Sequence, residues 1–240
     1  MILYKYYPCT AYTFKSMAVR GLWCHHPKNM NDPFECLGML DRPFNSDKLR
    51  DFREYAEKSH HSVLHAMKNC SDQELVIRLN KIRKGIIERF AFCSLSETFD
   101  DILMWSHYSS AHTGVVIGLE FPELSEDHHL QKVSYVNSLP SFDLIILAKF
   151  VEGEDRYLNY FFKDISIKSS DWCKEKEWRI WRKSPMYYFY KPENVKEIYF
   201  GVSCTKDTKK VILDLTSYLG DKFLYYNMVF KEEPVRLERE

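Results

Sequence analysis

The sequence predicts an α+β fold: a single domain over residues 1–240, with a mixed, mostly antiparallel β core and an inserted helical pair over residues 46–89. Two observations lead to this prediction. Segments typical of strands outnumber those that a regular alternation of strand and helix would give, and segments typical of helices cluster between them. A chain of 240 residues is also long enough for a sizeable core, and it shows neither internal repeats nor a clear linker.

The expected strands share runs of β-branched and aromatic residues that end at glycine, proline or polar turn residues. They are residues 3–8, 22–27, 90–96, 113–121, 133–136, 176–182, 195–202 and 223–230. The clearest is TGVVIGLEF, residues 113–121, in which β-branched residues follow a glycine.

The expected helices share capping or stop signals. They are residues 10–20, 46–68, 71–89, 100–110, 140–164 and 205–219. Gly21 stops the first, Ser46 caps the second, and Ser71 to Glu74 form a capping box that opens the third. The second and third are rich in charge and poor in glycine, so we expect them to pack on the side of the fold as an insertion.

Charge and composition exclude several classes of protein. Lysine plus arginine and aspartate plus glutamate number 34 each, so the formal net charge is zero and no broad charge for nucleic-acid binding is present. Aromatic residues make up 15% of the chain, which favours a rigid core or a stacking site. No P-loop, dinucleotide-binding glycine motif or kinase signature occurs.

Targeting signals and cysteines predict a soluble cytoplasmic protein. The N-terminus lacks the charged start and apolar run of a signal peptide, and no segment approaches the roughly 20 apolar residues that span a membrane. The seven cysteines are odd in number and include no C-x-x-C pair, which favours reduced thiols over a disulfide framework or a structural zinc site.

The segment CKEKEWRIWRK, residues 173–183, places two carboxylates beside two tryptophans. On a strand the odd-numbered residues from Glu175 to Trp181 would share one face, while Trp178 and Ile180 would anchor the other face in the core. One interpretation is a solvated ladder with a glutamate–arginine pair, which contributes little stability. The other is a carboxylate pair, with Glu177, at the edge of an aromatic cleft.

Two further segments carry polar and aromatic residues together. Ser94 and Ser96 would share a strand face, and the absence of a G-x-S-x-G motif argues against a hydrolase nucleophile. In MWSHY, residues 104–108, Trp105 and Tyr108 have helical spacing typical of core positions, and His107 has the alternatives of a packed residue or a ligand contact.

The turn NDPFE, residues 31–35, combines Asn31 and Asp32 with a proline, which is typical of side-chain-to-backbone turns. Asp32 and Glu35 are either turn and capping residues or the support of a ligand loop. We hypothesise that NDPFE and MWSHY both border the cleft of Glu177.

No metal site is predicted. His61 and His65 stand four apart on an expected helix, but no nearby acidic residue or cysteine completes a ligand set.

The order of these blocks resembles a family catalogued as a domain of unknown function and found widely in bacteria and phage. The blocks are LYKY, LW-x-x-x-P-x-x-x-NDPFE, FCS, MWSHY-x-x-x-H-x-GVVIGLEF, V-x-Y and W-x-x-E-x-EWR, and they span nearly the whole chain. A looser resemblance is to ADP-ribosyltransferases, which carry a nucleotide contact on the first strand, S-x-S on a middle strand and E-x-E late in the chain.

The second resemblance implies an ADP-ribosyltransferase-like fold and NAD as substrate, with Glu177 as the catalytic carboxylate and Glu175 as its helper. Lys5 or Tyr6 would replace the arginine or histidine that the family carries on its first strand. The residues that we expect to contact NAD are Tyr4, Lys5, Tyr6, Ser94, Ser96, Trp105, His107 and Tyr108. Four more are expected to shape the site: Asn31, Asp32, Glu35 and Arg179. The protein would be a toxin or phage-defence effector, with an unknown acceptor and an antitoxin as a partner.

Two alternatives remain open from the residues. One is a non-enzymatic binding module whose aromatic cleft holds a peptide or nucleotide, formed by Trp105, Tyr108, Trp178 and Trp181. The other is a metal-dependent nuclease that uses Asp32, Glu35, Lys174, Glu175 and Glu177, although these residues match no familiar nuclease spacing.

Overall fold

A twisted eight-stranded sheet runs through the molecule in the computed structural model, which describes residues 1–30, 41–121, 130–138, 140–222 and 224–240. The strands, in spatial order, are β12 (Val235–Arg239), β11 (Leu224–Glu232), β10 (Val195–Phe200), β4 (Val115–Glu120), β1 (Ile2–Tyr7), β3 (Ala91–Ser96), β8 (Glu177–Arg182) and β5 (Leu130–Lys132). Strands β10 and β11 are parallel, and the other neighbours are antiparallel. The predicted α+β class with a mixed, mostly antiparallel sheet is confirmed.

Two small sheets flank the large one. Strand β2 (Gly21–Cys24) pairs antiparallel with β9 (Met186–Phe189), and β6 (Ser134–Val136) pairs in parallel with β7 (Ile167–Ser169). A bridge between His25 and Phe92 joins the end of β2 to β3. The sequence did not predict β5, β7, β9 or β12, which are segments of three to five residues in which a period of two is weak.

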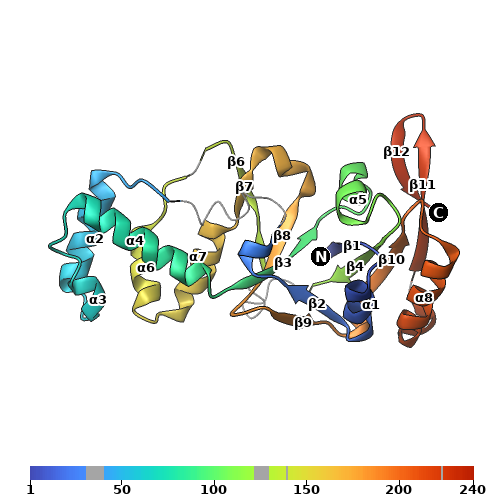
Figure 1. The fold of residues 1–240 in the computed structure, drawn as a ribbon, viewed down its shortest axis with the longest axis horizontal. Coiled ribbons are helices and arrows are strands. Elements are labelled where there is room, and N and C mark those ends of the chain that lie inside the picture. Colours follow the sequence, from blue (N-terminus) through green and yellow to red (C-terminus); the bar gives the residue numbers. More distant parts are fainter. Residues whose placement is uncertain (31–40, 122–129, 139, 223) are drawn as a thin grey trace.

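The α-helices are α1 (Ala11–Ala18), α2 (Ser46–Lys58), α3 (Ser62–His65), α4 (Asp72–Ile87), α5 (Ile102–Tyr108), α6 (Leu144–Val151), α7 (Leu158–Ile165) and α8 (Lys206–Thr216). Helices α2, α3, α4, α6 and α7 gather at one end of the molecule, and α1, α5 and α8 lie against the large sheet (Figure 1). Short 3-10 segments are η1 (Pro27–Asn29), η4 (Asp155–Tyr157), η5 (Ser170–Glu175), η6 (Pro192–Asn194) and η7 (Ser217–Lys222). Among the described residues no helix combines the length and apolar character that crossing a membrane requires.

The expected helical pair is instead three helices, which pack with α6 and α7 into one lobe (Figure 1). The segment from residue 46 breaks at Ser59, whose backbone is extended and whose hydroxyl bonds to Glu152 on the neighbouring segment. Asn45, not Ser46, caps α2, because its side chain accepts the Lys48 N–H at 2.9 Å. The capping box at Ser71 and Glu74 is confirmed.

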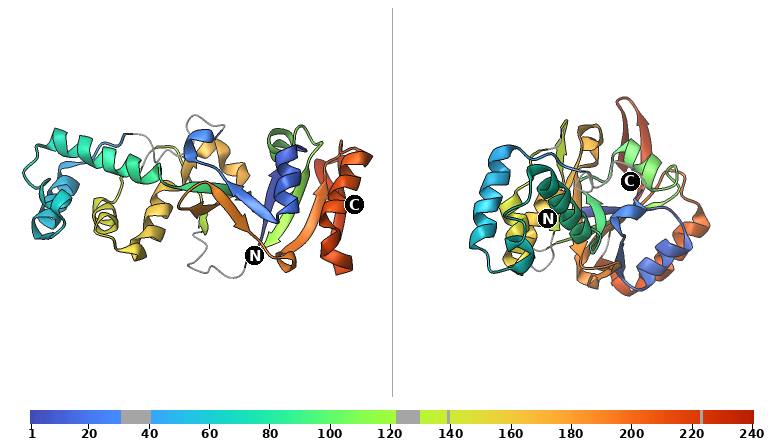
Figure 2. Two further views of the ribbon diagram at one scale, coloured as in Figure 1. Left: turned by 60° about the horizontal axis from the view of Figure 1, so that its bottom comes forward. Right: turned by 60° about the vertical axis from the view of Figure 1, so that its left-hand side comes forward.

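Hydrophobic cores lie on both faces of the sheet and in the helical lobe. Helices α1 and α8 lie side by side and cover one face with residues such as Met17 and Ile212, and α5 covers the other face with Trp105 (Figure 2). The lobe has its own core, which reaches Trp181 on β8.

The large sheet is incompletely paired between β1 and β3. Strand β1 pairs with β4 along its whole length, but it pairs with β3 only at Tyr4 and Ser96. Strand β3 is in turn fully paired with β8. Beyond Tyr4 the two strands therefore separate, and this split places side chains from both faces of the sheet around one opening.

Candidate functional site

A pocket of about 980 Å³ occupies the split between β1 and β3. Its wall also includes residues of α1, β2, α5, β7, η5, β8 and β9. The residues of the wall that the sequence had singled out are Tyr4, Lys5, Tyr6, Ser94, Ser96, His107, Tyr108, Glu175 and Glu177. Most of the sequence-predicted site thus meets in one place, although the roles of these residues remain predictions.

Glu177 is held in one orientation by side chains from three elements, β3, β8 and β7. Its Oε1 accepts hydrogen bonds from the Ser94 hydroxyl at 2.6 Å and from Arg179 Nε at 2.9 Å. Its Oε2 lies 3.5 Å from Lys168 Nζ. The side chain is 4% exposed, so these partners replace nearly all of its water.

Glu175 lies next to Glu177 but has different partners. Its Oε2 accepts a hydrogen bond of 2.7 Å from Lys168 Nζ, and its Oε1 accepts one of 2.5 Å from the Tyr108 hydroxyl. Lys168, on β7, therefore lies between the two carboxylates. With Arg179, the cluster contains two acidic and two basic side chains, so its formal charges balance within the buried wall of the pocket.

Burial and neighbouring charges move the pKa values of the two glutamates in opposite directions. Burial alone would raise the pKa of Glu177, but the positive charges of Arg179 and Lys168 outweigh it and lower this pKa to about 2. For Glu175 burial prevails over Lys168, and its pKa is raised above the ordinary value. Two carboxylates with divergent pKa values can divide electrostatic and proton-transfer tasks between them.

The solvated-ladder interpretation of this segment is wrong. Glu175, Glu177, Arg179 and Trp181 are all buried, because β7, η5 and the helical lobe cover their side of β8. The expected strand also begins later than predicted: Glu175 ends the 3-10 segment η5, and Lys176 has a positive φ of 45° that turns the chain into β8. The two carboxylates meet through this turn and not through a shared strand face.

The two serines of β3 differ in what they contact. Ser94 holds the Glu177 carboxylate, whereas the Ser96 hydroxyl donates to the backbone carbonyl of Glu175 at 2.7 Å. Ser96 also accepts the Thr98 N–H at 3.1 Å and is 1% exposed. Ser94 therefore orients the Glu177 carboxylate, while Ser96 bonds to the backbone at Glu175.

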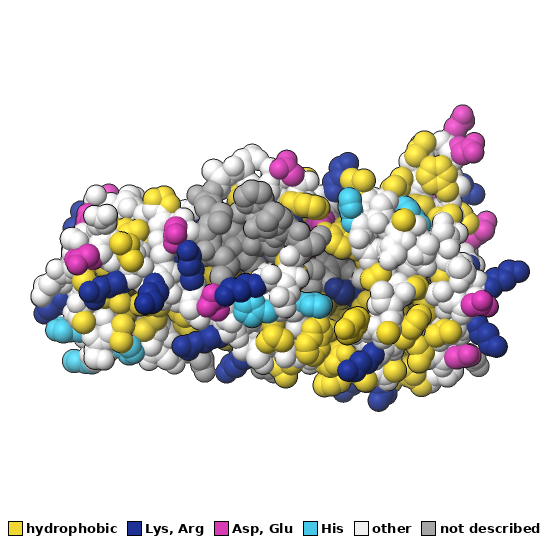
Figure 3. Space-filling view, viewed as in Figure 1, with side chains coloured by type: hydrophobic (Ala, Val, Ile, Leu, Met, Phe, Trp, Pro, Cys, Tyr) yellow, Lys and Arg dark blue, Asp and Glu magenta, His cyan; other side chains and the backbone are white. Residues whose placement is uncertain are grey.

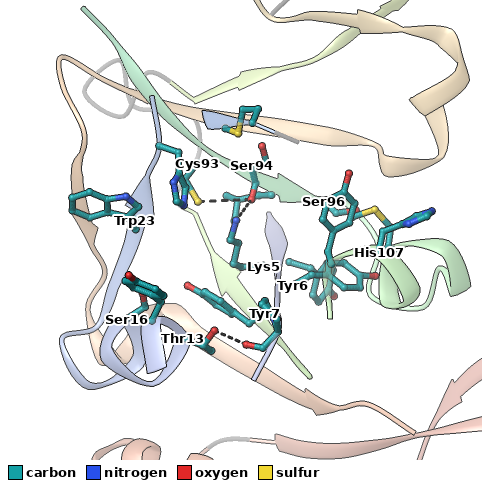
Figure 4. A pocket seen from close by; sticks show the side chains of 18 of the residues that line it. Lys5, Tyr6, Tyr7, Thr13, Ser16, Trp23, Cys93, Ser94, Ser96 and His107 are labelled. Carbon is teal, nitrogen blue, oxygen red and sulfur yellow. Dashed lines mark hydrogen bonds between the residues drawn. The ribbon is translucent and has the colours of Figure 1, made fainter. Parts of the chain in front are cut away.

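Lys5 projects into the middle of the pocket toward Ser94 (Figure 4). Its Nζ donates to the Ser94 carbonyl at 3.0 Å and lies 5.9 Å from the centre of the Tyr7 ring. Among the residues that the structure describes, it forms no ion pair with a carboxylate. Its positive charge is therefore available to a ligand.

Tyr4 and Tyr6 line the pocket, but their hydroxyl groups already have partners. The Tyr4 hydroxyl donates to Glu197 at 3.1 Å, and the Tyr6 hydroxyl donates to the Thr98 carbonyl at 3.0 Å. Burial, followed by the charge of Glu197, raises the pKa of Tyr4 to about 12, so this hydroxyl stays neutral. The two residues therefore offer the pocket their rings and not their hydroxyl groups.

The four-residue aromatic cleft proposed for a binding module is not assembled. Trp105 and Trp181 are 0% exposed and belong to different cores, because Trp105 packs against Tyr6 on β1 whereas the helical lobe covers Trp181. Trp178 is half-buried and donates to Glu97 at 2.8 Å. Tyr108 alone of the four lines the pocket, together with the exposed His107. Trp105 has a packing position and not the NAD contact that the sequence suggested.

Asn31, Asp32 and Glu35 lie outside the described residues, so the structure does not test the hypothesis for NDPFE. Asn29 and Met30, which immediately precede this turn, line the pocket.

Several residues of the pocket carried no signal in the sequence. Lys168 belongs to a three-residue strand, and Trp23, His25 and Tyr187 belong to the β2–β9 sheet, whose second strand was not predicted. The adjacent aromatic and histidine residues of LWCHHP were the one available hint.

The described part of the chain contains no group of three or more histidine, cysteine or acidic side chains suited to hold a metal ion. His61 lies at the N-cap of α3 and His65 in its last turn. Lys174, named for the nuclease alternative, is exposed and lies outside the pocket wall.

Comparison with known proteins identifies one similar family. Residues 104–180 match the sequence model of a family described as "Protein of unknown function (DUF2971)". The matched segment runs from α5 into β8 and contains the buried charged cluster of Lys168, Glu175, Glu177 and Arg179, together with Tyr108. Neither the curated proteins nor the solved structures include a match to this chain.

Proposed function

We propose that this protein is an NAD-using enzyme of the ADP-ribosyltransferase type, which breaks the bond between nicotinamide and ribose in the pocket between β1 and β3. The observation that carries the proposal is the Glu177 carboxylate. It lies in the pocket wall, it is oriented by Ser94 and Arg179, and its pKa is held at about 2.

Cleavage of a bond to the ribose C1 atom builds positive charge on the sugar ring, as in other reactions through an oxocarbenium-like transition state. A carboxylate that stays ionised and is fixed in place stabilises this charge without reorganising during the reaction. Arg179 and Lys168 keep Glu177 ionised, and Ser94 keeps its oxygen in position. Nicotinamide then leaves as a neutral molecule, taking the bonding electron pair.

Glu175 supports the second half of the reaction. The acceptor forms the new bond to C1 and loses a proton, which the Glu175 carboxylate takes. A raised pKa suits this task, because a general base works best when its pKa approaches the working pH. Lys168 and Tyr108 fix the two oxygens of Glu175 during the transfer.

A role as a toxin or phage-defence effector in the cytoplasm, with an antitoxin as partner, follows from the likeness to ADP-ribosyltransferases. NAD cleavage is tested before the acceptor is identified, with water as the simplest acceptor.

The test measures nicotinamide released from NAD by chromatography, with wild type, Ser94→Ala, Glu177→Gln and Glu120→Gln. Glu120 is a half-exposed carboxylate that pairs with Lys196 at 2.7 Å, so its substitution is a matched control outside the pocket. We expect release by wild type and by Glu120→Gln, and at least about a hundredfold loss in Glu177→Gln, a cost of about 2.7 kcal/mol in the barrier.

Circular dichroism and Tm establish that each variant is folded. Undiminished release by folded Glu177→Gln would contradict the assigned role. A wild-type protein that binds NAD but releases no nicotinamide would instead support the binding-module alternative. Ser94→Ala keeps all charges of the cluster, so it provides a second test if Glu177→Gln does not fold.

A further inference from the structure

The outer end of the pocket is lined by aromatic side chains that the proposed chemistry does not use. Trp23 on β2 and Tyr187 on β9 are direct partners in the small sheet, with ring centres 4.9 Å apart and ring planes at 70°. Tyr12 on α1 joins them in the pocket wall and is 84% exposed. We refer to Trp23, Tyr187 and Tyr12 as the aromatic mouth.

The aromatic mouth is built against a glycine. The Tyr187 ring packs on Gly21, where an added Cβ would lie 2.7 Å from Tyr187 Cδ1. The Tyr187 ring therefore packs closely on the backbone of β2 and beside Trp23, which keeps 38% of its surface exposed. Figure 3 shows hydrophobic side chains gathered over β2, β9 and α1 on this face. Exposed rings of this kind at a pocket opening offer flat surfaces for stacking.

Positive charge accompanies the aromatic mouth. Lys5 and Lys15 both line the pocket, and neither forms an ion pair with a carboxylate of the described chain. The acidic side chains in the described pocket wall are Glu175 and Glu177, and both are engaged by Lys168 in the buried cluster. Charge is thus divided along the pocket, with ionised carboxylate at the inner end and unpaired ammonium groups toward the mouth.

A chain of contacts sets the order of these groups. Glu177 bonds to the Ser94 hydroxyl, and Lys5 bonds to the Ser94 carbonyl. His25 lies close enough to Lys5 for that charge, after burial, to lower the histidine pKa, and the His25 ring lies 6.4 Å from Trp23. Figure 4 shows Lys5 reaching toward Ser94 from the neighbouring strand, with Trp23 at the far side of the pocket. The order is carboxylate, ammonium group, aromatic ring.

We infer that the aromatic mouth binds a purine base, which stacks on the Trp23 ring with its edge against Tyr187, while Lys5 contacts the attached phosphate. Stacking of bases on aromatic side chains and a lysine beside a phosphate are the two contacts that nucleotide ligands require most often. The assignment of this base to the adenosine half of NAD rests on the proposed function, since it places the ribose of nicotinamide at Glu177. The mouth residues would thereby favour NAD over nicotinamide mononucleotide, which has no purine base.

The test measures binding of AMP and of nicotinamide mononucleotide by calorimetry to the whole protein. Trp23→Ala and Tyr187→Ala should each weaken AMP binding about tenfold, the scale of one base–aromatic stack. Phe189→Ala is the matched control, because Phe189 is a 65% exposed aromatic residue of β9 outside the pocket wall. Lys5→Ala should weaken AMP binding and reduce its dependence on salt concentration. Nicotinamide mononucleotide, which has no purine, should bind Trp23→Ala as it binds wild type.

The possible outcomes separate this inference from the proposed function. If wild type releases nicotinamide but fails to bind AMP, or if Trp23→Ala binds AMP with unchanged affinity, the purine-binding role of the aromatic mouth is wrong. The proposed NAD cleavage is not affected by either result. If AMP binding depends on Trp23 but NAD is not cleaved, the purine-binding role of the aromatic mouth is supported and the proposed reaction is contradicted. A further arm uses a single-stranded oligonucleotide of adenines: if only its affinity depends on Trp23, and that of AMP does not, the inference of a free-nucleotide site is overturned.

Discussion

The Ser94 hydroxyl and Arg179 Nε donate to the same oxygen of Glu177, at 2.6 Å and 2.9 Å. Ser94 and Arg179 are themselves direct partners across β3 and β8. Glu177 lies two residues before Arg179 on β8, opposite Ser96. The carboxylate therefore lies diagonally across the strand pair, where both donors reach it. This arrangement separates the effects of the two serines.

Ser94→Ala should lower nicotinamide release by about tenfold, the rate equivalent of about 1.4 kcal/mol, because the Glu177 carboxylate loses a donor that orients it. The free energy of unfolding should fall by about 1–3 kcal/mol through loss of a hydrogen bond to a buried charge. Ser96→Ala is the matched variant, since its hydroxyl bonds to the Glu175 backbone. Kinetics with saturating NAD should show a smaller loss for Ser96→Ala. Equal losses for the two variants would argue that Ser94 acts only through the fold.

Glu177→Gln should be much less stable than Glu175→Gln. Removal of the Glu177 charge leaves Arg179 buried without its ionised partner, and breaking a buried pair costs about 3–5 kcal/mol. Glu175→Gln should cost less, because the raised pKa of Glu175 shows that burial already disfavours its charge, and Lys168 keeps Glu177 nearby. Urea unfolding of the three proteins measures the difference. A larger loss in Glu175→Gln would contradict the assignment of the principal charge pair to Glu177 and Arg179.

The stability that Glu177 contributes should depend on pH. Its pKa in the folded state, about 2, lies below the ordinary value of 4.5. A depressed carboxyl pKa stabilises the fold fully above the unfolded pKa, and this stability is lost as the pH falls through the folded pKa. The gap in unfolding free energy between wild type and Glu177→Gln should therefore be constant near neutral pH and narrow as the pH falls below 4.5 toward 2. A gap that stays constant over the acidic range would show that the pKa of Glu177 is not depressed.

Helix caps in the lobe offer a test of the corrected helix start. Asn45→Ala should lower the free energy of unfolding by about 1 kcal/mol, because the Lys48 N–H loses its acceptor. Ser71→Ala should cost a similar amount, since it removes one half of the capping box. Ser46→Ala should be nearly neutral, because Ser46 is the first residue inside α2 and not its cap. Thermal unfolding reports all three, and a loss in Ser46→Ala equal to that in Asn45→Ala would place the cap at residue 46 after all.

Several features could be predicted from the sequence because their causes are local. The strand at residues 113–121 follows from β-branched residues, and the capping box follows from the spacing of Ser71 and Glu74. Most of the predicted site also meets in one pocket, because β1, β3 and β8, which carry three of the blocks, are neighbours in the sheet.

The rest depends on contacts between residues that are far apart in the chain. Ser94 meets Glu177 only because the register of β3 and β8 brings together positions 83 residues apart. Trp23 is exposed at the pocket while Trp105 is buried, although both stand in short aromatic segments, because Tyr187 and the sheet pack on them differently. Local pattern fixes which residues prefer strand, helix or turn. Strand register and charge burial are set only by the tertiary structure. The register of β3 and β8 brings Glu177 to the pocket, and the different surroundings of Glu175 and Glu177 give them different pKa values.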